Sequence, residues 1–351
     1  TRWDTFFPFL TEENMHRGPR KTWAIGTGCT GAATDDCNDP LVSIYCFVYN
    51  RERYIAQTIE SVLNQTYRNI EFVILNDGST DGTADIIEKY LGDERIRYHY
   101  QDNIGRALLK YDELNNRAVR LTKGELVGAI GADDIYLPDK IARQVEEFRL
   151  HPELDVSFCN GRLIDGSGNL MPSQFRHARA LTFNRNNFLR WIFTSNFIAH
   201  PSVLIRRSAF DAHNGFETGY CPDLHFWLKT AGKLQYKYLD EMLWYYRVHD
   251  EAGTAPKNNE LMMRSTFEVL KAFHDSCSIE DIYPEIAACG NKADALYSAH
   301  LDFGNLLLTG RFALLPHLAI AEYERAGNIR NDAPEATNNL AIAFAAAGDR
   351  E

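Results

Sequence analysis

The chain has 351 residues, of which 45% are hydrophobic and 24% are charged, and its formal net charge is −11. This composition is typical of a globular protein and argues against a disordered one. The acidic balance argues against nucleic acid or an anionic membrane as the main partner, so any phosphate site must be built locally, from backbone N–H groups, a few cations and a metal ion.

Residues 1–39 are irregular and polar, and we interpret them as an extension or linker. From residue 40 onward, strand-like and helix-like segments alternate. Apolar runs predict buried strands at residues 41–48, 70–75, 96–100 and 125–130. Helical spacing predicts helices after Asn50, which is a candidate helix cap, and around residues 86–91, 105–121 and 138–148. This alternation predicts an α/β fold, a mostly parallel sheet flanked by helices with a Rossmann-like nucleotide-binding half.

Three of the predicted strands end in polar segments. These are Tyr49-Asn50-Arg51, Asn76-Asp77-Gly78-Ser79 and Asp133-Asp134. Open α/β sheets bind their ligands at the carboxyl ends of the strands, where such loops collect. We therefore expect the three segments to form one site.

Beyond residue 150 the pattern mixes short strands with helices and then becomes helical. Strands are predicted at residues 156–159, 202–205, 236–239 and 243–248, and helices near 184–193 and 223–231. From residue 258 to the end every segment has a helical pattern. We therefore divide the chain into an N-terminal extension (1–39), an α/β domain (40–257) and a helical region (258–351).

The end of the helical region, from about residue 303, resembles tetratricopeptide repeats. Phe303-Gly304-Asn305 is echoed by Asn338-Asn339-Leu340-Ala341, at a spacing slightly longer than the standard repeat of roughly 34 residues. The alternative is an alanine-rich helical hairpin that caps the α/β domain. Such repeats form concave peptide-binding surfaces. A protein partner or self-association through this region is therefore an open expectation.

Seven cysteines are scattered along the chain without a Cys-x-x-Cys pair. This pattern is typical of reduced thiols rather than of disulfides or a zinc site. No run approaches the roughly 20 apolar residues that cross a bilayer. We expect a cytoplasmic protein and leave open a peripheral attachment to the inner face of the membrane.

Four segments between residues 40 and 250 carry a family resemblance. They are Pro40-Leu41-Val42-Ser43-Ile44 through Arg51, Ser61-Val62-Leu63-Asn64-Gln65-Thr66-Tyr67, Asn76 through Thr83, and Asp133-Asp134-Ile135-Tyr136-Leu137-Pro138-Asp139-Lys140. In this order and at these separations they resemble a family-2 glycosyltransferase of the GT-A fold. The resemblance implies an inverting enzyme that uses a nucleotide-sugar, usually a UDP-sugar, with Mn²⁺ or Mg²⁺.

The resemblance also assigns roles to the acidic residues. Asp77 matches the family's contact to the nucleotide base, which suits a carboxylate because it accepts from an imide N–H. Asp133 and Asp134 match the last two carboxylates of an Asp-x-Asp-Asp run, which begins here with Gly131. Hard cations take carboxylate oxygens. Asp134 is expected to bind metal and Asp133 to face the sugar or ribose, with the roles open to exchange. The alternatives are turn formation by Asp77 and a solvated acidic pair.

Asp223, in Cys221-Pro222-Asp223-Leu224-His225, matches the family's catalytic base. It would take the proton from an acceptor hydroxyl, with His225 a weaker candidate and helix capping the alternative. His249 matches a late histidine that contacts metal or diphosphate, although a lone histidine is more often structural. Further expected contacts to the nucleotide-sugar are Ser43, Tyr45, Tyr49, Asn50, Arg51 and Arg106. Residues 200–202 are candidates for the acceptor side.

Together these features predict transfer of a sugar from a UDP-sugar to a hydroxyl. The acceptor would be a glycan, a lipid-linked molecule or a protein, in synthesis of a bacterial surface glycan or glycoconjugate. A nucleotidyltransferase is disfavoured because the loop after the first strand, residues 49–54, has no glycine. The alternative from another class is an inactive GT-A domain that binds a partner through its helical tail.

Overall fold

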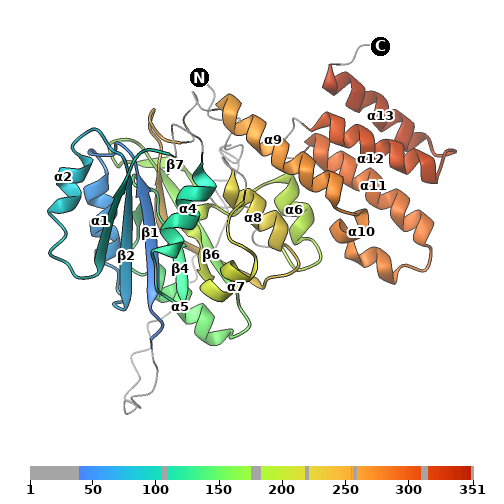
Figure 1. Cartoon of the computed structure of the whole chain (residues 1–351). Coiled ribbons are helices and arrows are strands. Elements are labelled where there is room, and N and C mark those ends of the chain that lie inside the picture. Colours follow the sequence, from blue (N-terminus) through green and yellow to red (C-terminus); the bar gives the residue numbers. More distant parts are fainter. Residues whose placement is uncertain are drawn as a thin grey trace.

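The computed structural model describes residues 39–104, 110–174, 183–217, 221–253, 255, 259–309 and 315–348. It shows an α/β domain with a stack of helices at one side (Figure 1). The predicted extension therefore lies almost wholly outside the described residues. Among the described residues, no helix combines the length and the apolar character that a membrane span requires. The described cysteines, Cys46, Cys159, Cys221, Cys277 and Cys289, are all free thiols.

The first half of the sheet is parallel, in the order β3-β2-β1-β4. Its strands are β1 (Val42–Val48), β2 (Ile70–Asp77), β3 (Ile96–Gln101) and β4 (Leu126–Ala129). The connecting helices are α1 (Ile55–Leu63), α2 (Thr83–Glu88), α4 (Tyr111–Arg120) and α5 (Lys140–Leu150). The predicted strand–helix alternation and mostly parallel sheet are confirmed. Part of the helix predicted at 105–121 lies outside the described residues.

The second half of the sheet mixes strand directions. Its strands are β5 (Ile135–Tyr136), β6 (Val156–Ile164), β7 (Leu170–Gln174), β8 (Leu204–Arg206) and β9 (Tyr236–Arg247). β8 is antiparallel to β4 and to β6, whereas β9 is parallel to β6. The two short strands predicted at 236–239 and 243–248 are one strand. The polar pair Asp240-Glu241 interrupts the apolar pattern but not the pairing, which continues past a register shift near Asn160.

Helices cover both faces of the sheet, and they bury the side chains on both sides of its central strands. Along β1, Tyr45 points into one apolar cluster while Ile44 and Cys46 point into the other. This alternation is the period of two that an extended strand imposes. The Ile44 side is covered by α1 and α5, and the Tyr45 side by α4, α6 (Phe188–Thr194) and α8 (Pro222–Thr230).

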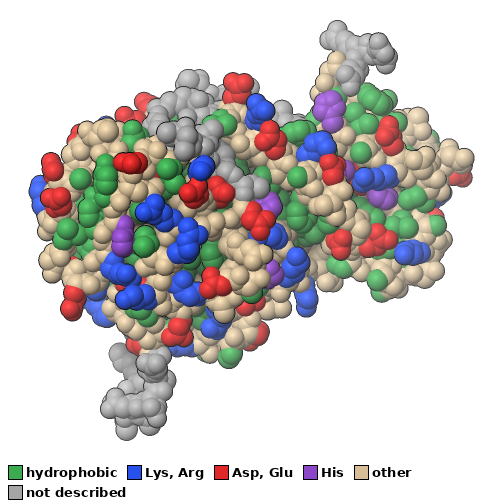
Figure 2. All heavy atoms as spheres, viewed as in Figure 1, with side chains coloured by type: hydrophobic (Ala, Val, Ile, Leu, Met, Phe, Trp, Pro, Cys, Tyr) green, Lys and Arg blue, Asp and Glu red, His purple; other side chains and the backbone are tan. Residues whose placement is uncertain are grey.

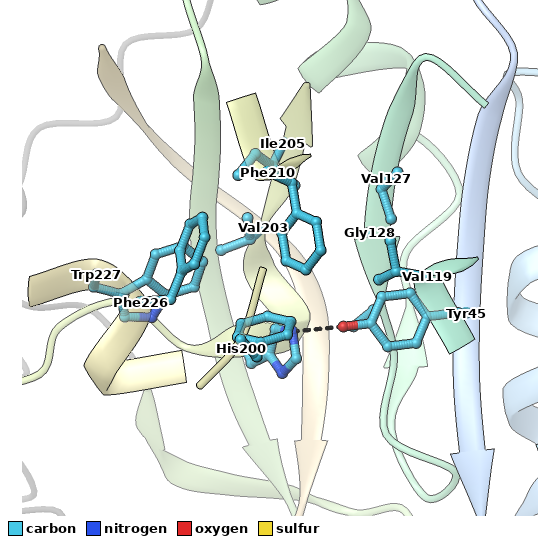
Figure 3. Close-up of a pocket in the computed structure, with 12 residues that line it drawn as sticks. Tyr45, Val119, Val127, Gly128, His200, Val203, Ile205, Phe210, Phe226 and Trp227 are labelled. Carbon is cyan, nitrogen blue, oxygen red and sulfur yellow. Dashed lines mark hydrogen bonds between the residues drawn. The ribbon is translucent and has the colours of Figure 1, made fainter. Parts of the chain in front are cut away.

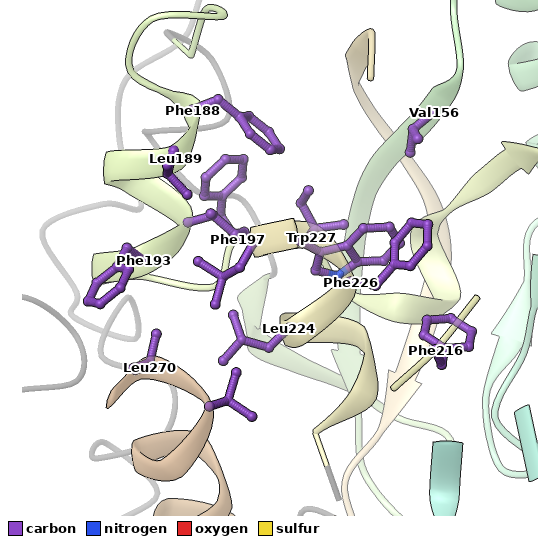
Figure 4. Packing of buried hydrophobic residues seen from close by; sticks show 14 of the residues in the cluster. Val156, Phe188, Leu189, Phe193, Phe197, Phe216, Leu224, Phe226, Trp227 and Leu270 are labelled. Atoms are coloured by element: carbon purple, nitrogen blue, oxygen red, sulfur yellow. The ribbon is translucent and has the colours of Figure 1, made fainter. Parts of the chain in front are cut away.

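The helical region continues the Tyr45-side cluster. Its helices are α9 (Asn259–Ser276), α10 (Ile279–Ile282), α11 (Lys292–Thr309), α12 (Pro316–Ile329) and α13 (Pro334–Ala347). Leu224 of α8 and Leu270 of α9 belong to the same buried cluster (Figure 4). The same cluster reaches Phe303 in α11 and Ala343 in α13. The predicted helical character is confirmed, and the likeness to tetratricopeptide repeats stays a prediction.

Charge is distributed unevenly over the surface. Figure 2 shows Lys and Arg side chains gathered on one face of the α/β domain, around α4 and β4, although the formal net charge is −11. Arg117 and Arg120 lie in the last turn of α4. Basic residues there interact favourably with the negative end of the helix dipole. Part of this basic face therefore has a local structural explanation.

Candidate active site

The predicted polar loops meet at the carboxyl edge of the sheet. The Asn50 N–H donates to Ser79 Oγ at 3.0 Å, and the Asn50 side-chain oxygen accepts from the Thr80 N–H at 2.7 Å. The Arg51 N–H donates to Thr83 Oγ1 at 2.8 Å. These bonds join the loop after β1 to the loop after β2. The Arg51 side chain also reaches the acidic loop through Asp133 Oδ2, so the three segments lie together at this edge, and their use as one ligand site stays a prediction.

Asn50 is not a helix cap, so that part of the prediction is wrong. α1 begins at Ile55, Tyr54 precedes it, and no side chain caps it. Asn50 has a φ of 50°, in the left-handed region that asparagine tolerates better than most residues. Its side chain is used to join the two loops, and it is therefore not available to the helix.

Asp133 is the centre of the charged cluster in this site. Its Oδ2 accepts from Arg51 Nε at 3.0 Å and from His249 Nε2 at 2.9 Å. Burial acts to raise the pKa of Asp133, but the His249 hydrogen bond and the Arg51 charge outweigh it and hold that pKa below its usual range. Asp133 is therefore ionised at neutral pH.

Asp134 has different surroundings, although it is the next residue. It is 2% exposed, and its Oδ1 accepts from the Arg247 N–H at 3.0 Å. Burial and the neighbouring Asp133 raise the pKa of Asp134 well above its usual range. The expected metal pair of Asp134 and His249 is not observed, because His249 contacts Asp133. A hydrogen bond to the backbone of β9 holds the Asp134 side chain instead.

The missing first carboxylate of the motif has a steric counterpart. A Cβ at Gly131 would lie 2.6 Å from Asp134 Oδ2 and 3.0 Å from Asp133 Oδ1. Both carboxylates thus lie close over the glycine backbone. A larger residue at 131 would push them outward, so Gly131 fits the arrangement observed.

The end of β9 fixes His249. Its imidazole packs on Tyr54 with ring centroids 4.7 Å apart, and its side chain is 7% exposed. The Arg247 guanidinium lies 4.8 Å from the centre of the same Tyr54 ring and donates from Nε to the Asp133 carbonyl at 2.8 Å. His249 therefore presents an oriented imidazole to Asp133.

The described residues contain no group of three or more His, Cys, Asp or Glu side chains arranged to hold a metal ion. A magnesium-type ion at a nucleotide site, however, commonly takes one or two carboxylates and obtains other ligands from phosphates and water. Imidazole is a suitable manganese ligand. Asp133 Oδ2 and His249 Nε2 lie 2.9 Å apart, and the two side chains fit such a partial ligand set.

Asp223 lies in the first turn of α8 and is partly buried. The residue before the helix is Cys221, and no side chain caps the helix, so the capping alternative is not observed. Among the described residues, none donates a hydrogen bond to the Asp223 carboxylate. Its charge acts on three neighbours, Tyr45, His200 and Cys221. The part of the chain that the structure describes thus leaves the carboxylate oxygens without a hydrogen-bond donor.

Residues 43–213 match the family model "Glycosyl transferase family 2". An uncharacterized glycosyltransferase of Rickettsia typhi is 32% identical over 230 residues, which is 63% of this chain and 68% of that protein. The chain belongs to glycosyl transferase family 2.

Other relatives of this family-2 chain are larger. The Escherichia coli chondroitin synthase is 31% identical over 234 residues, 66% of this chain and 32% of that protein. The chain thus spans about a third of that synthase's length. Among solved structures, Staphylococcus aureus TarS aligns with a TM-score of 0.55 and 19% identity over 88% of this chain and 53% of that one. The Pyrobaculum calidifontis mannosyltransferase PcManGT, in complex with GDP-Man and Mn2+, has a TM-score of 0.53 and 16% identity over 89% and 88%. The GT-A-type fold is thereby confirmed.

Several predicted donor contacts in this family-2 chain need correction. Ser43 is fully buried at the amino end of β1, bonded to Glu71 Oε1 at 2.5 Å and to the Gly124 N–H at 2.7 Å. It cannot contact a ligand at the carboxyl edge. Tyr45 is 2% exposed, and its hydroxyl bonds Asn115 and His200 rather than the site's loops. Arg106 lies outside the described residues.

Asp77 and Tyr49 remain at the predicted edge. Asp77 is 1% exposed, and its Oδ1 accepts from Gln101 Nε2 at 2.6 Å and from the Ile104 N–H at 3.0 Å. These bonds fit the alternative in which Asp77 shapes the turn, and its contact to a nucleotide base stays a prediction. Tyr49 is partly exposed, and its carbonyl accepts from Arg51 at 3.2 Å.

A hydrogen-bond network near Asp223 is not predictable from the sequence. Tyr45 bonds both Asn115 and His200 there, and Tyr45 and His200 line a mainly apolar cavity of ≈ 20 Å³ (Figure 3). One water needs roughly 10–15 Å³ of such space, so no sugar fits in it. Residues 200–202 were suspected on the acceptor side, but nothing in the sequence singles out Asn115.

Proposed function

We propose that the chain is an inverting, metal-dependent glycosyltransferase that moves a sugar from a UDP-sugar to a hydroxyl of a bacterial surface glycan or glycoconjugate. The observation that carries the proposal is the Arg51–Asp133–His249 cluster at the carboxyl edge of the sheet, with Asp223 in the first turn of α8, to whose carboxylate no described residue donates a hydrogen bond. Membership of family 2 supports it.

The donor is inferred from the site and from similar proteins. TarS has been solved with UDP and with UDP-GlcNAc, at TM-scores of 0.51 and 0.50 to this chain. Chondroitin and hyaluronan synthases are among the sequence relatives. In this chain Arg51 supplies a guanidinium beside the acidic loop. Guanidinium groups suit phosphate oxygens, so Arg51 is proposed to pair with the diphosphate.

Asp133 and His249 would hold the metal ion. Asp134 would hold the acidic loop in place through its hydrogen bond from the Arg247 N–H. The ion, when bound, neutralises the diphosphate and stabilises the charge that develops on it as it leaves. This proposal exchanges the two aspartate roles, because His249 contacts Asp133.

Asp223 is proposed as the base. The acceptor O–H gives its proton to the Asp223 carboxylate, and the oxygen forms a bond to the anomeric carbon. The bond from that carbon to the diphosphate oxygen breaks on the opposite face, and the diphosphate keeps the electron pair. Attack from the face opposite the leaving group inverts the anomeric configuration.

A specific observation favours an additional interaction role for the helical region. Ile342 and Phe344, two large apolar side chains of α13, are 59% and 37% exposed. An inactive domain that binds a partner through this helix is therefore kept as the second candidate.

The test is calorimetric titration of UDP into the purified chain, with Mn²⁺ and then with EDTA. We expect binding that requires metal. Asp223→Asn should keep this affinity and abolish transfer from the UDP-sugar that the wild type uses, because the amide has the shape of the carboxylate but accepts no proton. Undiminished turnover in that variant would remove Asp223 as the base. If the titration detects no binding of UDP, GDP or dTDP, the result would favour the partner-binding alternative.

A further inference from the structure

A larger cavity lies at the other end of α8 from Asp223. Its volume is ≈ 370 Å³, and its lining includes Phe183, Arg185, Gly232 and Tyr238. Ligand pockets commonly have volumes of about 300 to 1,000 Å³, so this cavity has the size of a ligand site. The nine residues of α8 span roughly 13 Å, with Asp223 in the first turn and Gly232 just beyond the last one.

The cavity is separate from the donor site. Tyr238, which lines the cavity, lies near the start of β9, whereas Arg247 ends that strand and contacts the acidic loop at the Asp133 carbonyl. In the pairing with β6, Tyr238 lies opposite Phe158 and Arg247 lies opposite Ile164. At about 3.3 Å per residue of β6, the two places are roughly 20 Å apart.

One wall of the cavity is aromatic. Tyr236 and Tyr238 also lie two positions apart on β9, so their side chains point to the same face of the sheet. Tyr236 packs on Phe188 of α6 with ring centroids 4.4 Å apart (Figure 4 labels Phe188). Tyr238 and Phe183 pack on Phe158, at 5.3 and 5.7 Å. The rings are therefore held in place from behind, while Tyr236, Tyr238 and Phe183 stay partly exposed.

The rim of the cavity carries planar polar side chains. Asn184, Arg185 and Asp240 line it and are exposed. Arg185 donates to the Gly232 carbonyl at 3.1 Å, and among the described residues no carboxylate pairs with its guanidinium. Asp240 Oδ1 accepts from the Tyr238 hydroxyl at 3.2 Å, which ties this carboxylate to the aromatic wall. Hydrogen-bonding groups thus border the exposed rings.

A carbohydrate is the ligand class that fits this lining. A sugar ring has C–H groups on its faces, which pack on an aromatic ring, and hydroxyls around its edge. Amide, carboxylate and guanidinium side chains can form paired hydrogen bonds with neighbouring hydroxyls. A purely apolar ligand would leave these polar groups unpaired. A phosphate-rich ligand fits poorly, because Asp240 lines the cavity and Lys237, its second cation, is already paired with Glu147 at 2.6 Å.

We propose that this cavity binds a segment of a glycan chain, apart from the place where the sugar is transferred. The cavity and Asp223 lie at opposite ends of α8, so a long acceptor held here would stay bound while its end reacts. This consequence rests on the proposed function, whereas glycan binding itself does not.

Binding is tested on the full chain without nucleotide and with EDTA. The probes are cellotetraose, chitotetraose and a hyaluronan tetrasaccharide, which are neutral, N-acetylated and acidic, and saturation-transfer NMR measures their affinity. We expect at least one probe to bind, and Tyr238→Ala and Arg185→Ala each to weaken it roughly fivefold, as expected for one aromatic contact or one charged hydrogen bond. Arg68→Ala is the matched control, because Arg68 is also exposed but does not line the cavity.

The exposed Arg185 side chain can be removed without opening the core, so Arg185→Ala alone decides the test if Tyr238→Ala does not fold. Failure of all three probes to bind would overturn the proposal. Equal affinity of wild type and Arg185→Ala for the probe that binds would also overturn it.

The consequence for transfer is measured with a short and a long version of the acceptor that the wild type uses. Arg185→Ala should raise KM for the long acceptor more than KM for the short one. An equal effect on both would show that the cavity does not hold the acceptor. Failure of the proposed function gives a different result, because the wild type would then transfer no sugar while the probe would still bind and still be lost in Arg185→Ala.

Discussion

The two neighbouring aspartates of the acidic loop differ in what they can do. Asp133 accepts hydrogen bonds from two cationic or cation-capable side chains, Arg51 and His249. Asp134 accepts from a backbone N–H of β9 and is more deeply buried. A metal ion needs an anionic oxygen that it can reach, so the burial and contacts favour Asp133.

This difference predicts opposite results for two matched variants. Asp133→Asn should remove the Mn²⁺ dependence of UDP affinity, because a neutral amide is a poor ligand for a hard cation. Asp134→Asn should keep that dependence, since an amide oxygen can still accept from the Arg247 N–H. Titration of UDP with Mn²⁺ and with EDTA measures both. The reverse pattern would return the metal role to Asp134.

Sequence reasoning identified the acidic loop but not which aspartate faces the site. Adjacent residues in a turn can point in any relative direction, and His249 is separated from Asp133 by more than a hundred positions. The same limit applies to Tyr45. Its place in the middle of β1 was evident from the strand pattern, but that pattern cannot show that its hydroxyl is used by Asn115 and His200.

At the scale of elements, α11 and α12 approach closely because Gly304 has no side chain. A Cβ at Gly304 would lie 2.5 Å from the Tyr323 ring. The Tyr323 hydroxyl donates at 2.8 Å to Oδ1 of Asn305, the residue that follows Gly304, and this bond fixes the ring in place. The ring therefore cannot move aside without losing this bond.

Gly304→Ala should destabilise the protein by about 1–3 kcal/mol, the usual cost of overpacking. Gly327→Ala in α12 is the control, because a Cβ there meets nothing within 4 Å. Alanine in an open helical position should stabilise by roughly 0.5–1 kcal/mol. Urea unfolding measures both changes. Equal effects of the two substitutions would show that the α11–α12 contact is looser than described.

The alternation of strands and helices was predictable because β1 and β2 are mainly apolar runs and α1 carries apolar residues at helical spacing. The prediction was weaker in the second half, where β8 contains only Leu204–Arg206 and β9 carries a polar interruption. β9 pairs with β6 through residues that are roughly 80 positions apart in the chain. A local sequence pattern carries no information about such a pairing.

At the scale of the whole molecule, a buried ionic cluster ties three helices together. Glu322 of α12 is 1% exposed and accepts from His274 of α9 at 2.8 Å and from His300 of α11 at 2.7 Å. Arg325 also pairs with it, and Asp275 lies 3.6 Å from His274. Burial acts to raise the pKa of Glu322, but the histidine hydrogen bonds and nearby charges lower it from 4.5 to about 2.

When the pKa of a carboxyl group is lower in the folded chain than in the unfolded chain, its ionisation stabilises the fold. This stabilisation is complete at pH values above the unfolded-state pKa. That stability, about 3 kcal/mol for such a shift, is lost as the pH falls from about 4.5 towards 2. Glu322→Gln should therefore be less stable than the wild type at pH 7, and the gap should shrink between pH 5 and pH 3. Denaturant unfolding at several pH values measures the gap. A gap that is constant with pH would contradict this account.

The apolar cluster that begins at Tyr45 in the sheet continues through α8 and α9 to Ala343 in α13. The sequence pattern becomes helical at residue 258, but the hydrophobic core is continuous across this position. Cutting the chain there would uncover the apolar sides of α6 and α8, including Phe193 and Leu224. Helix α8 also carries Asp223, the proposed base, so the helical region packs on the same helix that holds this residue. The helical region (258–351) is therefore part of the core of the protein and not an independent module. A fragment that lacks it would expose these apolar side chains, and we expect such a fragment to aggregate.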